Sequence, residues 1–120
     1  MGRMQTEVNF EDYLDAEVMD QAGHFVGTLL CLWMDEYSQA AFLGIKSESP
    51  PKKTCIVPAT LAEADERRSC VWLWVAQEKI KGAPGLDCDA RLDPELETRV
   101  YHYFQLSRPS KRRRFQMSTR

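Results

Sequence analysis

The alternation of apolar and polar residues predicts a β-hairpin over residues 14–35. A short first arm, residues 14–19, leads into a polar turn, where Asp20 favours the turn start and Gly23 tolerates a positive φ. The second arm, residues 24–35, is apolar at both alternating sets of positions. One set holds Phe25, Leu29, Cys31 and Trp33, and the other holds Val26, Leu30, Leu32 and Met34. Because successive side chains of a strand point to opposite faces, both faces of this strand should be covered.

A glycine inside the second arm modifies this prediction. Gly27 lacks a side chain to pack, so it indicates a bulge, a sharp bend or close contact between two backbones. A bend at this point would allow the sheet to curl.

Three more strands are expected, over residues 40–46, 55–57 and 70–76. The loop at 47–53 contains two consecutive prolines, and Pro58 should end the 55–57 strand or place it at a sheet edge. Residues 59–64 have a composition compatible with a short helix. Residues 10–15 could form a helical turn or lead directly into the first strand.

The strand at 70–76 is apolar on both faces, with aliphatic residues on one side and Trp72 and Trp74 on the other. If the aliphatic set fills the interior, both indoles point outwards. Leaving them in water would forgo several kcal/mol of burial. We therefore expect either the C-terminal helix or a second copy of the protein to cover them.

The chain should end in a well-marked helix. Asp93 supplies an N-cap oxygen and Pro94 suits the first helical position. One apolar stripe follows, at Leu96, Val100, Tyr103 and Phe104. A single helical turn is expected at 78–81, before the interruption at 82–85.

Length and composition predict one globular domain. The chain has 120 residues, 43% of them hydrophobic and 28% charged, and a domain of this size buries roughly 65% of the surface that its unfolded chain exposes. We expect a loose N-terminus at 1–9, a domain at 10–106 and a flexible tail at 107–120. The longest apolar run is far too short to span a membrane and the N-terminus has no signal-peptide pattern, so the expected location is cytoplasmic.

Charge is distributed unevenly along the chain. The net charge is −2, but residues 107–120 hold six bases and no acid, whereas the remainder holds 10 bases and 18 acids. The cluster Lys111, Arg112, Arg113 and Arg114 could bind phosphates or anionic lipid, although a short basic terminus that binds nothing is the favoured interpretation.

The four cysteines, Cys31, Cys55, Cys70 and Cys88, show neither a C-x-x-C pair nor a histidine at ligand spacing. We expect reduced, structural thiols rather than a zinc site or a disulfide framework.

These features together resemble the PRC-barrel family, found in the cytoplasmic part of the photosynthetic reaction centre H subunit and in a maturation factor of the small ribosomal subunit. The resemblance covers roughly residues 13–106. Its matching segments are residues 18–27, Asp35, residues 56–58, residues 81–84, residues 92–97 and residues 101–104. It implies a mainly β fold, namely a six-stranded, partly open barrel with a C-terminal helix. It also implies that the domain acts as an adaptor and has no catalytic residues.

Catalytic and metal-binding patterns are weak. His24 and His102 have no nucleophile or orienting group nearby in the sequence. The acids at 87, 89, 93 and 95 resemble a calcium loop only superficially, because Arg91 and Leu92 stand where an EF-hand has a ligand and a glycine. No Walker motif, dinucleotide fingerprint or nucleophile elbow is present. The sequence therefore predicts no enzyme, no metal and no cofactor.

Three functions remain open. The first is an adaptor that forms homodimers and docks on another protein through aromatic residues. These are Trp33, Trp72, Trp74, Tyr101 and Phe104. The second is an RNA- or ribosome-associated factor that uses the basic tail. The third, implied only by the resemblance, is an accessory of membrane-bound photosynthetic electron transfer.

Overall fold

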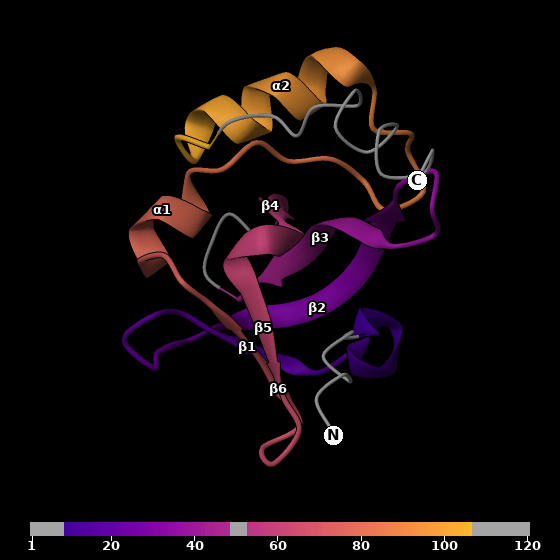
Figure 1. Ribbon diagram of the computed structural model, residues 1–120. Helices are drawn as coiled ribbons and strands as arrows, with labels where there is room; N and C mark the ends of the chain where they lie inside the picture. The colour runs from indigo at the N-terminus through magenta and orange to yellow at the C-terminus, as the bar shows by residue number, and fades with distance from the viewer. Residues whose placement is uncertain (1–8, 49–52, 107–120) are drawn as a thin grey trace.

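The computed structural model describes residues 9–48 and 53–106, which form a six-stranded mixed sheet with a C-terminal helix (Figure 1). The strands are β1 (Glu17–Met19), β2 (Phe25–Met34), β3 (Ala40–Ser47), β4 (Thr54–Pro58), β5 (Ala62–Asp65) and β6 (Cys70–Leu73). The helices are the 3-10 helices η2 (Phe10–Tyr13) and η3 (Ala59–Leu61), and the α-helices α1 (Gln77–Lys81) and α2 (Pro94–Tyr103).

The predicted hairpin is confirmed as β1 and β2, which pair antiparallel. Gly23 closes its turn with a φ of +88°. Gly27 lies so close to β3 that a Cβ atom would overlap the carbonyl oxygen of Lys46, which confirms the predicted contact between backbones.

The expectation that both faces of β2 are covered holds only in part. A register shift between Leu29 and Cys31 interrupts the regular alternation. Val26 and Leu29 are both buried, although they belonged to opposite predicted sets. Three large apolar side chains of the strand are exposed: Phe25, Leu30 and Met34.

The sheet order is β4-β3-β2-β1-β6-β5, and the two edges are β4 and β5. Neighbouring strands are antiparallel except β1 and β6, which run parallel. Pro58 ends β4 at an edge, as predicted. The outer side of β4 is covered, because Ile56 N–H donates to the Pro84 carbonyl at 2.9 Å and Leu86 N–H donates to the Thr54 carbonyl at 3.2 Å.

The core lies between the sheet and α2, which runs across β4 and β3 at the top of Figure 1. Asp93 caps α2 by accepting from Leu96 N–H at 2.8 Å, as predicted. Val100 and Phe104 are buried as the stripe required, and Leu96 and Tyr103 pack against the core. Among the described helices, none has the length and apolar character needed to cross a membrane.

Two sequence-based interpretations of the β5–β6 region need correction. Residues 59–61 form the short 3-10 helix η3, but residues 62–64 belong to β5 and do not continue the helix. The alternation of alanine with charged residues at 62–65 places the alanines on the inner side of the sheet, which offsets their low strand propensity. The strand predicted at 70–76 also ends earlier, at Leu73.

The prediction of four reduced cysteines was wrong for two of them. Cys31 on β2 and Cys88 between α1 and α2 form a disulfide, with Cα atoms 5.9 Å apart. The connection holding Cys88 returns to β2, where Trp33 Nε1 also donates to the Ala90 carbonyl at 3.0 Å. The 57-residue separation hid this pairing from the sequence. Cys55 and Cys70 are free and buried, as expected, and burial raises the pKa of both thiols.

Candidate interaction surface

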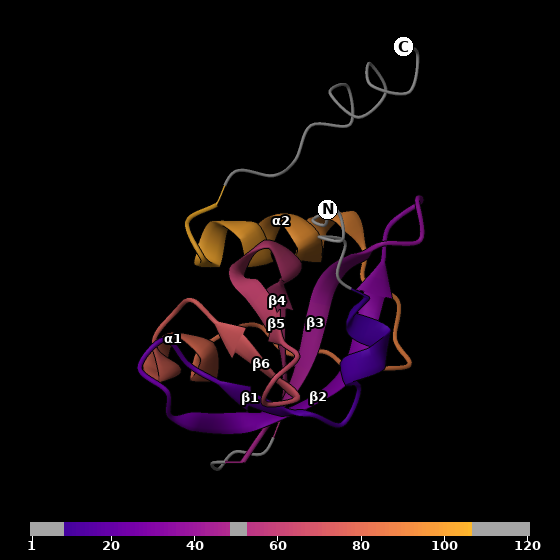
Figure 2. The ribbon, with the colours of Figure 1, turned by 60° about the horizontal axis from the view of Figure 1, so that its bottom comes forward.

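A groove of about 1260 Å³ lies between the β5–β6 hairpin and the N-terminal helix η2. Both views show the hairpin beside the indigo helix (Figures 1 and 2). The groove runs from the residues around η2 and the start of β1 to the outer part of the hairpin. Three aromatic side chains line it, namely Tyr13, Trp72 and Trp74.

The two tryptophans are covered unequally. Trp72 is half-buried, and its Nε1 donates to Asp65 Oδ2 at 3.1 Å. The Arg68 guanidinium carbon lies 5.9 Å from the centre of the same ring. Trp74 has no such partner among the described residues, and 52% of it is exposed.

The C-terminal helix does not cover this pair. α2 packs against β4 at the other edge of the sheet, so one of the two covers proposed from the sequence is wrong. Val71 and Leu73 are fully buried, which confirms that the aliphatic set faces inwards. The second candidate cover, another copy of the protein, remains open.

The groove is strongly acidic. Its lining contains one basic residue, Arg67, and five acidic residues: Asp12, Asp15, Glu63, Asp65 and Glu66. The hydrogen bond from Trp72, followed by the one from Arg68 N–H, holds the pKa of Asp65 below its usual value. Burial and the carboxylates of Glu66, Asp12 and Asp65 raise the pKa of Tyr13. At neutral pH the wall therefore carries negative charge beside exposed aromatic surface.

The edge of β5 borders the groove, and no strand among the described residues pairs with it. Trp74 N–H donates to the Leu61 carbonyl at 2.9 Å, which fixes the phase of the β5–β6 ladder. In that phase Glu63 and Asp65 exchange backbone hydrogen bonds with β6, whereas Ala62 and Ala64 direct their backbone groups away from it. Ala62 N–H donates to the Ala59 carbonyl. Within the described ranges, Ala64 N–H and the carbonyls of Ala62 and Ala64 have no partner.

The five predicted interaction residues are not brought together. Trp33 is partly buried at the disulfide side of β2, bonded to Ala90. Tyr101 and Phe104 are each 7% exposed and belong to the core, and the Tyr101 ring centre lies 5.1 Å from that of Phe42. Trp72 and Trp74 share the groove. The predicted anion-binding residues Lys111, Arg112, Arg113 and Arg114 lie outside the described residues.

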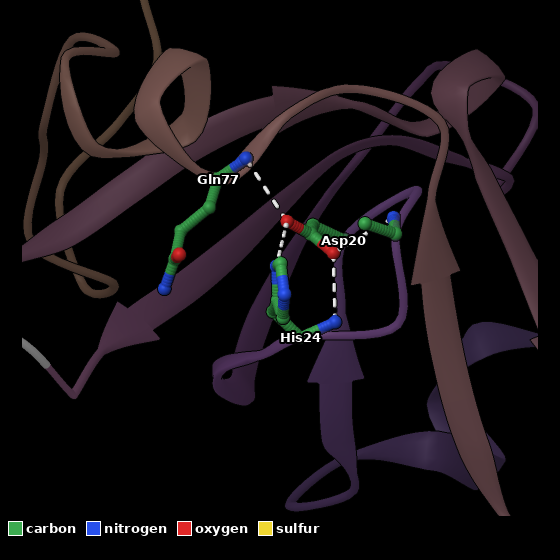
Figure 3. Close-up of polar contacts among 4 residues, drawn as sticks. Asp20, His24 and Gln77 are labelled. Carbon is green, nitrogen blue, oxygen red and sulfur yellow. Dashed lines mark hydrogen bonds and ion pairs between the residues drawn. The ribbon is translucent and has the colours of Figure 1, made fainter.

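A buried carboxylate in the hairpin turn, that of Asp20, accepts several hydrogen bonds (Figure 3). Asp20 Oδ1 accepts from Ala22 N–H at 2.9 Å and His24 N–H at 2.8 Å, and Oδ2 accepts from Gln77 N–H at 3.2 Å. Burial acts to raise the pKa of Asp20, but the hydrogen bonds from His24 and Ala22 outweigh it and lower the pKa.

Asp20 therefore joins the β1–β2 turn to the start of α1. His24 Nδ1 lies 3.3 Å from Asp20 Oδ2, but the His24 side chain is 67% exposed. Because the carboxylate accepts hydrogen bonds from backbone N–H groups of both segments, its role in the structure is to hold the turn against the start of α1. Within the described ranges, no group of three or more histidine, cysteine or acidic residues could hold a metal ion.

The sequence missed the acidic wall of the groove. Residues 65–69 carried a charged-turn signal, but the proximity of Asp65 to Trp72 depends on the β5–β6 register. The acidic residues around η2, Asp12 and Asp15, are distant in sequence from those of the β5–β6 hairpin, and only the folded chain brings the two groups to one groove. Comparison of the chain with models of protein families and with curated proteins finds no match to either.

Proposed function

We propose that the protein is a non-catalytic protein-interaction module that docks on another protein through the groove at the β5–β6 hairpin. The observation that carries this proposal is the 52% exposure of Trp74 beside Trp72, at a sheet edge that no described residue pairs with. Covering about 100 Å² of indole would stabilise a complex by about 2.5 kcal/mol.

We further propose that the sheet is a partly open barrel of the PRC type. Six strands in mixed order, a long curved β2 and a C-terminal helix over the β4 edge support this assignment (Figure 2). In such a barrel the opening lies between the two edge strands. Here residues 84–86 cover the β4 edge, whereas no residue in the described part of the chain pairs with the β5 edge. Such an edge is suited to docking, because an unpaired strand can accept a strand from a partner.

The described residues favour docking over catalysis. The buried carboxylate of Asp20 accepts from backbone N–H groups, and none of its hydrogen-bond partners in the described part of the chain is a nucleophile. The RNA-binding alternative depends on residues outside the described ranges, and the acidic groove would repel a polyanion. The electron-transfer alternative gains no support from any described contact.

Affinity capture from a native lysate, quantified by mass spectrometry, tests the docking face. The bait is the full chain, compared with Trp74→Gln and with the matched control Leu30→Gln, which alters an exposed apolar residue on β2. We expect one set of proteins to be retained by the wild type and by Leu30→Gln, and lost by at least tenfold with Trp74→Gln. Equal recovery by all three baits would refute the assignment of the docking face.

A further inference from the structure

The groove and the basic segment of this chain have complementary charge. Five acids and one base line the groove. Residues 107–120 contain six bases and no acid, and Lys111, Arg112, Arg113 and Arg114 are followed by Phe115. A run of bases with an adjacent aromatic residue matches a surface that combines carboxylates with exposed indole.

The free edge of β5 supplies backbone groups for such a segment. Ala64 N–H and the carbonyls of Ala62 and Ala64 point away from β6 and border the groove. An extended peptide laid along β5 would pair with these three groups. Its side chains would alternate between the two faces of the sheet. On the outer face they would meet Glu63 and Asp65, which lie across the ladder from Trp72 and Cys70.

The position of α2 favours a segment from a second copy. The yellow end of α2 and the indigo helix η2, whose residues line the groove, lie on opposite sides of the ribbon in both views (Figures 1 and 2). We therefore assign the segment to a neighbouring copy, which can approach the groove from outside the domain.

We propose that the β5-edge groove binds the basic segment 108–115 of a second copy, so that two copies exchange these segments. The inference rests on the proposed function, because it assigns a partner chemistry to the same docking face. Its physical basis is strand addition at β5 combined with pairing between lysine or arginine and the groove carboxylates. Such pairing should weaken steeply as salt is added.

Sedimentation velocity of the full chain tests this exchange. The test variant replaces Lys111, Arg112, Arg113 and Arg114 with Gln. The matched control replaces four exposed bases outside the groove with Gln, at Lys46, Lys81, Arg91 and Arg99. We expect the wild type and the control to self-associate at 50 mM NaCl. Association should weaken at least tenfold in the test variant, and also in the wild type at 500 mM NaCl. A test variant that associates as well as the control, or a wild type that stays monomeric at 100 µM, would overturn the inference.

Amide hydrogen exchange at Ala64 provides a second, site-specific measurement. In the wild type, Ala64 N–H should exchange at least tenfold more slowly at 100 µM than at 1 µM, while the Val71 amide in the β6 ladder shows no such dependence. Equal Ala64 rates at both concentrations would contradict strand addition. If Trp74→Gln loses its captured partners but the test variant still self-associates, the proposed function stands and this inference fails.

Discussion

Removal of the Cys31–Cys88 disulfide should destabilise the protein substantially. The bond closes a loop across a sequence separation of 57 residues. The chain-entropy relation gives a contribution of about 4 kcal/mol for a loop of this length. The Trp33–Ala90 hydrogen bond would still hold the same connection near β2, so we expect a net loss of about 3 kcal/mol for Cys31→Ser with Cys88→Ser.

Urea unfolding followed by tryptophan fluorescence measures this loss. With a slope of about 1.5 kcal/mol per molar urea, 3 kcal/mol corresponds to a midpoint about 2 M lower. Dithiothreitol should lower the wild-type midpoint similarly and leave the double variant unchanged. A midpoint shift below about 0.3 M, or four free thiols in the non-reduced wild type, would refute the reasoning.

The same bond bears on location. Disulfides persist in oxidising compartments and are rare in a reducing cytosol. The cytoplasmic location expected from the sequence therefore stays a prediction, and trapping the thiols in intact cells before lysis would test it. Fully reduced Cys31 and Cys88 in the cell would agree with a cytoplasmic protein.

Four further predictions concern the hairpin turn, the contact between β2 and β3, and the hydrogen bond between Trp72 and Asp65. Asp20→Ala leaves three backbone donors without their partner and should lower the free energy of unfolding by about 3 kcal/mol. An unchanged urea midpoint would show that these hydrogen bonds do not stabilise the fold. Because the folded-state pKa of Asp20 is lowered, its contribution should be fully present above the unfolded value near 3.9 and fade as pH falls through the folded pKa, so the gap between wild type and Asp20→Ala should narrow in acid. Gly27→Ala should lower the melting temperature by several degrees, because the new Cβ meets the Lys46 carbonyl; a neutral effect would show that β2 and β3 can separate there. Trp72→Phe should lower the free energy of unfolding by about 1 kcal/mol, and most of this loss should disappear in an Asp65→Asn background. Full additivity of the two substitutions in a double-mutant cycle would show that the hydrogen bond between Trp72 and Asp65 does not contribute.

The sequence predicted the features that depend on local chemistry. The turn at Asp20–Gly23, the close approach at Gly27 and the cap at Asp93 each follow from one residue type at one position, and the structure confirms all three. The inward side of β6 followed from simple alternation.

The features that the sequence missed depend on distant partners. Residues 62–65 form a strand only because β6 pairs with them, and Cys31 meets Cys88 only after the chain has passed through four further strands and α1. Tyr101 lies outside the predicted apolar stripe, yet it is buried against Phe42 on β3. The acidic groove likewise combines η2 with β5, two elements whose proximity no periodicity reveals.

Site-specific photocrosslinking tests the central claim, that the groove beside β5 and β6 is where another protein docks. The full chain would carry p-benzoylphenylalanine in place of Trp74, and a matched chain would carry it in place of Leu30, another exposed apolar residue. Irradiation in native lysate should join position 74 to a distinct polypeptide that position 30 does not capture. No adduct at position 74, or the same adducts at both positions, would contradict the account.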